Sequence, residues 1–266
     1  MLTDSDDQVL CAFCHEPLRA HARFCGKCGH ALGDDPEETP GGLPEHQSTG
    51  EDVWPLVKPV LVFWVLLLAL SGLIGLLGHV TDIGSPIYDL IFQLISTGII
   101  LVYVCKDREN LFPLLGNFGP SPKRSFILTG ACLVILYVAM GLYFKLLELL
   151  GVEFVQYLTD YRSHHWPFWS AVLLIAVLPG VFEELAFRGV IMSRLQRIGS
   201  PAEAILLQAI LFSVLHMLPA IFISHFFFGL CLGVLRRKTG SLYPAMTVHI
   251  LWNFYVLLNE MLVQTP

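Results

Sequence analysis

The stretch 178–190 reads LPGVFEELAFRGV and places Glu183, Glu184 and Arg188 inside an apolar run over residues 167–188. A charged side chain in the middle of a bilayer costs roughly 2.5–3.5 kcal/mol on insertion scales, so such residues are functional candidates by default. Glu184 and Arg188 are four residues apart and can pair on one helix face. Glu183 is rotated by about 100° from Glu184 and is therefore free to act as a base.

Six further apolar stretches accompany this one, and together they predict an all-α polytopic transmembrane helix bundle over residues 53–266. Most are long enough for a membrane span, which needs roughly 17–25 residues, and we predict about seven spans. The stretches are 56–78, 86–105, 126–144, 167–188, 202–218, 219–235 and 241–262. The chain is 55% hydrophobic and 14% charged, whereas a soluble domain carries about 25% charge. The composition therefore disfavours an ordinary cytosolic globule.

The basic residues indicate an orientation. If the N-terminus is inside, 13 of the 16 lysines and arginines fall in cytoplasmic segments, which fits the positive-inside rule. We therefore expect a multi-pass protein of the cell membrane, surrounded by the lipid bilayer, with a cytoplasmic N-terminus. Residues 1–52 carry 11 acids and 3 bases, and residues 53–266 carry 11 acids and 13 bases. Neither part has the dense basic patch that phosphate neutralisation needs, so no nucleic-acid partner is expected.

Four of the seven cysteines lie within 18 residues near the N-terminus and predict a structural zinc ribbon over residues 8–31. The four ligands, in two CxxC pairs, are Cys11, Cys14, Cys25 and Cys28. Such pairs can bring four thiolates around one tetrahedral Zn²⁺, with no open position for catalysis. Because no secretory signal opens the sequence, we expect these thiols to stay reduced in the cytoplasm. The segment resembles the short zinc ribbons at the termini of many prokaryotic membrane proteins, and a cytoplasmic protein partner for it is left open. Residues 32–52 are rich in Pro, Gly and acids and predict a flexible acidic linker.

Two other apolar stretches carry polar residues at helical spacing. Phe212 lies one turn before His216, so we expect its ring to lie against that imidazole. His249 and Asn253 are four residues apart and share one helix face. With Glu183 these residues lie roughly 12–23 Å from the cytoplasmic helix ends, which is compatible with one chamber open to the cytoplasm. His225 is interpreted as a packing or hydrogen-bonding residue.

Three patterns in order resemble the motifs of the CAAX protease and bacteriocin-processing (CPBP, or ABI) family. They are EExxxR at Glu183–Arg188, FxxxH at Phe212–His216 and HxxxN at His249–Asn253. The segment FFFGLCLGVLRRKTGSLYPAMTVHILWNF is also similar to the family's C-terminal stretch, and the resemblance covers about residues 165–256. It implies an intramembrane endopeptidase that hydrolyses peptide bonds of membrane-associated or lipidated peptides, or of membrane proteins. It also implies that Glu183 activates water with the assistance of His216. By the same resemblance, His249 and Asn253 stabilise the oxyanion, and Glu184 with Arg188 braces the site.

Two alternative functions remain open at this stage. A non-catalytic membrane scaffold or bacteriocin-immunity protein would keep the Glu184–Arg188 pair for stability, but it leaves Glu183 without a purpose. A zinc-dependent intramembrane metalloprotease would bind its metal through His216, His249 and Glu183, with Glu184 as the base. Because a carboxylate paired with Arg is a poorer base, a mechanism without a catalytic cofactor is the leading hypothesis.

Overall fold

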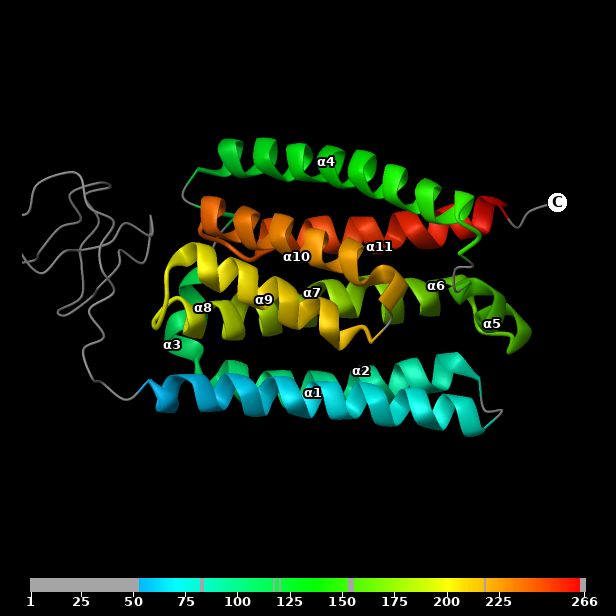
Figure 1. Cartoon of the computed structure of the whole chain (residues 1–266), viewed down its shortest axis with the longest axis horizontal. Helices are drawn as coiled ribbons and strands as arrows, with labels where there is room; N and C mark the ends of the chain where they lie inside the picture. The colour runs from blue at the N-terminus through cyan, green and yellow to red at the C-terminus, as the bar shows by residue number, and fades with distance from the viewer. Residues whose placement is uncertain are drawn as a thin grey trace, which may run out of the picture. The chain divides into compact units, whose positions relative to one another are not determined.

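The computed structural model describes residues 53–81, 84–116, 118–119, 121–152, 156–217 and 219–263. In this part of the chain every regular element is a helix, and the helices form one compact unit that begins at Trp54 (Figure 1). The predicted zinc ligands Cys11, Cys14, Cys25 and Cys28 and the predicted linker 32–52 lie outside the described residues.

The long helices follow the seven predicted apolar stretches closely. The elements are α1 (Trp54–Val80), α2 (Ser85–Lys106), α3 (Arg108–Leu111), η1 (Phe112–Leu115), α4 (Pro122–Leu149), α5 (Tyr157–Ser163), α6 (Phe168–Ala171), η2 (Val172–Val177), α7 (Leu178–Glu184), η3 (Leu185–Ile191), α8 (Met192–Leu195), α9 (Pro201–Leu215), α10 (Pro219–Thr239) and α11 (Tyr243–Val263). Elements α6 to α8 form one continuous apolar helix, Phe168–Leu195, in which the segments η2 and η3 are π-helical.

Four described helices are long and apolar enough to cross a membrane, which identifies a membrane protein. They are Trp54–Gly78, Ser85–Lys106, Pro122–Leu149 and Phe168–Leu195. The prediction of seven spans is not confirmed, since α9, α10 and α11 are not among them. Helix α9 has 15 residues, which gives a length of about 22 Å against a hydrocarbon thickness of about 30 Å. Figure 1 shows that α9 stops short of the end of the bundle where α5 lies, and that α10 runs back beside it.

The composite helix Phe168–Leu195 lies in the middle of the bundle and carries the central charged residues. It contacts α2 on one side and α11 on the other, while α4 covers α10 and α11 and α1 packs beside α2 (Figure 1). Helices α9 and α10 pack very closely. A Cβ atom at Gly229 would lie 2.9 Å from Cα of Ala209, and one at Gly233 would lie 2.7 Å from Nε2 of Gln208. The four-residue spacing of these glycines is typical of a helix-packing face.

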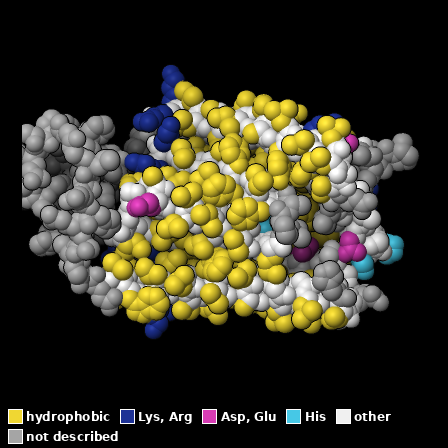
Figure 2. All heavy atoms as spheres, viewed as in Figure 1, with side chains coloured by type: hydrophobic (Ala, Val, Ile, Leu, Met, Phe, Trp, Pro, Cys, Tyr) yellow, Lys and Arg dark blue, Asp and Glu magenta, His cyan; other side chains and the backbone are white. Residues whose placement is uncertain are grey.

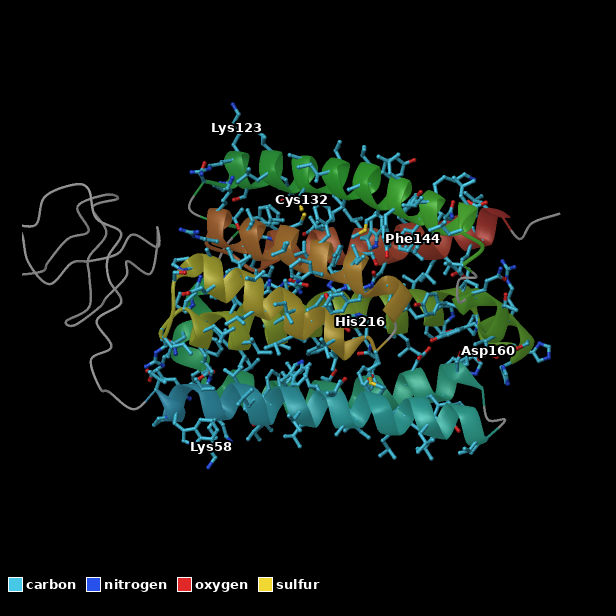
Figure 3. All side chains as sticks on the ribbon, in the orientation of Figure 1. Lys58, Lys123, Cys132, Phe144, Asp160 and His216 are labelled. Carbon is cyan, nitrogen blue, oxygen red and sulfur yellow. The ribbon has the colours of Figure 1, made fainter. Side chains whose placement is uncertain are left out.

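The basic residues concentrate at one end of the bundle and tie the helix ends together. Arg194 donates to both carboxylate oxygens of Asp107, at 2.5 and 2.7 Å, which joins α8 to the end of α2. Arg236 donates to Oε1 of Gln196 at 2.7 Å and to Oγ of Ser193 at 2.9 Å. Figure 2 shows most of the visible Lys and Arg atoms at this end, with hydrophobic side chains over the middle of the face. Lys58 and Lys123 mark this end in Figure 3, and Asp160 marks the opposite one.

Candidate active site

The core of the site is a buried charge network that connects the composite helix to α11. Glu184 and Arg188 have no exposed side-chain surface, and Nη1 of Arg188 donates to Oε1 of Glu184 at 2.8 Å. Nδ1 of His249 lies 2.8 Å from the same oxygen. A carboxylate only accepts hydrogen bonds, so Nδ1 of His249 carries the hydrogen and Nε2 is left unprotonated in the neutral ring. The predicted Glu184–Arg188 pair therefore forms, and it also fixes the orientation of His249.

Glu183 is not part of this pair and lies on the other side of the His249 ring from Glu184. Its side chain is 20% exposed, and Oε2 lies 3.8 Å from Nε2 of His249. Glu183 also lines a cavity of about 10 Å³, which is close to the volume that one water molecule requires. The cavity is lined by Leu67, Phe92, Gln93, Ser96, Ile100, Phe182, Glu183, Ala186, Phe187 and Leu215. A carboxylate beside a water-sized space and opposite an imidazole nitrogen has the arrangement that general-base chemistry needs.

Phe212 is the centre of an aromatic cluster that brings the three histidines of α9, α10 and α11 together. Its ring centroid lies 4.8 Å from that of His216, 6.0 Å from that of His225 and 6.1 Å from that of His249. The guanidinium of Arg188 lies 4.6 Å from the centre of the same ring. Figure 3 places His216 at the turn between α9 and α10, inside the bundle. Phe212 therefore contacts His216 as its spacing predicts, and it also contacts two further imidazoles and Arg188.

The rings of His216 and His225 are both held by backbone carbonyls of their own helices. Nδ1 of His216 lies 2.9 Å from the carbonyl oxygen of Phe212, and Nδ1 of His225 lies 3.0 Å from that of Ile221. Since a carbonyl oxygen only accepts hydrogen bonds, each Nδ1 carries the hydrogen. In the neutral ring each Nε2 is then unprotonated and can accept a proton or a hydrogen bond. The two rings are 4.0 Å apart between centroids. His225, interpreted from the sequence as a packing residue, does pack, and the ring it packs against belongs to a candidate catalytic residue.

Asn253 makes a contact that its sequence pattern did not predict. Its amide nitrogen Nδ2 donates to the backbone carbonyl of Ile175 at 2.9 Å, in the π-helical segment η2. From α2, Nε2 of Gln93 donates to the neighbouring carbonyl of Leu174 at 3.1 Å. An amide group has two N–H hydrogens, so an oxyanion role for Asn253 would have to use the second one.

Gln93, Ser96 and His225 are site residues that the sequence analysis did not select. Gln93 and Ser96 are buried polar residues that line the same cavity as Glu183. A buried Gln in an otherwise apolar span needs a partner, and this is the signal that could have found it.

The described residues contain no group of three or more His, Cys, Asp and Glu side chains placed to hold a metal ion. His216, His249 and Glu183, the ligands of the metalloprotease alternative, do not form such a group in the described structure. The steps proposed below use no catalytic metal.

Comparison with known proteins gives a match to the motif-bearing part of the chain. Residues 165–255 match the family model described as Rce1-like, Type II CAAX prenyl endopeptidase. No curated protein and no solved structure matches the chain. The matched segment begins between α5 and α6, ends within α11 and includes every candidate catalytic residue. This match supports the CAAX protease family, whose members are peptide hydrolases.

Proposed function

We propose that this protein is an intramembrane endopeptidase that hydrolyses peptide bonds with a water molecule activated by Glu183. The observation that carries the proposal is the approach of the Glu183 carboxylate to Nε2 of His249, at 3.8 Å, beside a water-sized cavity. The fully buried Glu184–Arg188 pair supports it, because burying an ion pair is costly and this pair also engages Nδ1 of His249 through Oε1 of Glu184.

In the proposed reaction, Glu183 removes a proton from the water molecule while the oxygen of that water bonds to the carbonyl carbon of the substrate. The carbonyl oxygen becomes an oxyanion, and the C–N bond then breaks. The amine leaves with a proton returned from Glu183 or supplied through His216. The net change is the addition of one water across the peptide bond, and no oxidant or reductant is needed.

His249 and Asn253 are proposed to stabilise the oxyanion. Nδ1 of His249 already donates its hydrogen to Glu184. A proton on Nε2 would therefore give His249 a second donor, on the side of the ring that faces Glu183. Such donors lower the barrier by about 3–4 kcal/mol when they are placed in advance. The second amide hydrogen of Asn253 would be the other donor.

The proposed substrates are membrane-associated or lipidated peptides and membrane proteins. The surroundings of Glu183 support this class, since the cavity beside it is lined mostly by apolar side chains, which come from α1, α2, α9 and the composite helix. We place the protein in the cell membrane and its basic end in the cytoplasm, following the positive-inside rule.

The test is cleavage of a panel of membrane-associated peptides by the purified protein and by Glu183→Gln. Removal of the base should lower kcat by about 10²–10⁴-fold. Glu148→Gln is the matched control, because its side chain is 64% exposed and lies in the exposed pair with Lys145. A non-catalytic scaffold or immunity protein would retain its function in Glu183→Gln, and that outcome would contradict the enzyme proposal.

We also propose that Cys11, Cys14, Cys25 and Cys28 hold one structural Zn²⁺ that takes no part in hydrolysis. The full chain should contain about one zinc, as a site of four thiolates requires, and a Cys11→Ser, Cys25→Ser variant should contain none. Cleavage by residues 51–266 should continue in the presence of a chelator. Loss of cleavage on chelation, with recovery on adding Zn²⁺, would instead favour the metalloprotease mechanism.

A further inference from the structure

The composite helix has a defect directly before its catalytic segment. Pro179 lacks a backbone N–H, so it cannot donate to the carbonyl of Ile175 as an α-helical residue would. The N–H of Leu178 donates to Leu173, five residues back, and therefore does not serve Leu174. The carbonyls of Leu174 and Ile175 are left without their usual helical donors, in the interior of the protein.

Both carbonyls receive a side-chain amide from a different helix. Nε2 of Gln93 on α2 donates to Leu174, and Nδ2 of Asn253 on α11 donates to Ile175. Gln93 is buried, with 7% of its surface exposed. Two amides of the same chemistry thus approach adjacent carbonyls from two helices, and together they hold the composite helix at its defect.

Glu183 lies one turn after Pro179, so its direction depends on this defect. A π-helical turn contains about one more residue than an α-helical turn, and closing it would rotate the following residues by about 100° around the axis. Glu183 would then leave either the cavity or the side of the helix that faces His249. The carbonyls that the two amides cap are the ones left open by the π-helical hydrogen bond of Leu178 and by Pro179.

We propose that Gln93 and Asn253 are positioning residues that stabilise the π-helical turn at Leu174 and Ile175 and thereby aim Glu183 at His249. This inference rests on the proposed role of Glu183. It gives Asn253 a task that needs no contact with substrate, and it gives Gln93 a task in a part of the chain without any catalytic motif.

The experiment is a set of double variants built on Pro179→Ala, which restores a backbone N–H within reach of these carbonyls. Gln93→Leu and Asn253→Leu are each made in the natural background and in the Pro179→Ala background, and the thermal unfolding midpoint is measured in detergent. In the natural background each substitution should lower the midpoint. In the Pro179→Ala background, the loss from at least one of the two should shrink, because the backbone then supplies the missing donor.

Gln208→Leu is the matched control. Gln208 is a buried amide on α9 that donates to the carbonyls of Ile205 and Gly229, away from η2. Its loss in midpoint should be the same in both backgrounds. If the losses from Gln93→Leu and Asn253→Leu are also unchanged by Pro179→Ala, the proposal is wrong.

Kinetics give a second readout that a merely stabilising role would not move. Gln93→Leu should lower kcat about tenfold at temperatures where it is fully folded, while KM stays unchanged, and Asn253→Leu should lower kcat further because it also removes the proposed oxyanion donor. Unchanged kcat in folded variants would overturn the positioning role. If Glu183→Gln retains cleavage, the proposed function fails instead, and the unfolding midpoints still decide whether the two amides serve the carbonyls opened by Pro179.

Discussion

The composite helix Phe168–Leu195 and helix α1 are two long apolar helices with opposite surroundings. In their most apolar stretches, 56% of the residues are buried in the composite helix and 17% in α1. The buried helix carries Glu183, Glu184 and Arg188, whereas α1, which also contains Pro59 and three glycines, exposes Leu, Val and Trp side chains. Lipid is as apolar as a leucine side chain, so hydrophobicity does not mark the core of a membrane protein; polar and charged residues do.

The largest difference in unfolding free energy is expected between breaking a buried and breaking an exposed ion pair. Arg188→Met leaves Glu184 buried without its cation, and should lower the free energy of unfolding by about 3–5 kcal/mol. Lys145→Met breaks the Lys145–Glu148 pair, whose side chains are 63% and 64% exposed, and should cost about 0–1 kcal/mol. Unfolding in detergent, followed by circular dichroism, measures both. Equal losses would remove the distinction between the buried ion pair of the composite helix and an exposed ion pair on α4.

A second contrast uses one added methyl group. A Cβ atom at Gly180 in the composite helix would overlap Cγ1 of Ile250 and lie 3.0 Å from the backbone nitrogen of that residue, whereas at Gly75 in α1 nothing lies within 4 Å. Gly180→Ala should therefore destabilise the protein by about 1–3 kcal/mol. Gly75→Ala should be neutral or stabilising by up to about 1 kcal/mol. A neutral Gly180→Ala in the same unfolding assay would mean that α7 and α11 can separate freely.

The contrast between the two helices is not complete, because one face of α1 packs against the rest of the bundle. Nε1 of Trp64 donates to the carbonyl of Leu211 on α9 at 2.9 Å. Trp64→Phe should cost about 0.5–1.5 kcal/mol, the usual net value of one hydrogen bond. Trp169→Phe is the control in the composite helix, since Trp169 is 66% exposed. If Trp169→Phe were the more destabilising change, the helix that carries a residue would determine the cost of substitution more than the exposure of that residue.

The smallest expected effect on stability concerns Asp160 of α5, at the end of the bundle opposite the basic residues and outside both helices. Hydrogen bonds from Ser85 lower the pKa of Asp160 below its usual value of 3.8. A lowered pKa in the folded state gives stability that is present above the usual pKa and is lost as the pH falls through the lowered value. Asp160→Asn should therefore flatten the fall of the unfolding midpoint in the acid range below about pH 4. An identical acid profile in both proteins would exclude this contribution.

The sequence predicts the helices well because each long helix is one apolar run, bounded by Pro, Gly and charged residues. It also brings Glu184 to Arg188 through their four-residue spacing. It does not predict the contact of Asn253 with Ile175, since that pairing depends on a π-helical turn and on the distance between two helices. Pro179 is the visible signal: a proline inside an apolar run leaves a carbonyl that must find another donor. The sequence does not predict the contact of His216 with His225 either, because that contact depends on how α10 runs back beside α9.

The length of α9 has a consequence for biosynthesis. A 15-residue helix of about 22 Å cannot cross the hydrocarbon on its own. We therefore expect α9 to enter the bilayer together with α10 and not as an independent span. The Arg236, Arg237 and Lys238 cluster that ends α10 would then keep both outer ends of the pair on the same side, so that His216 reaches its depth without any chain being carried across.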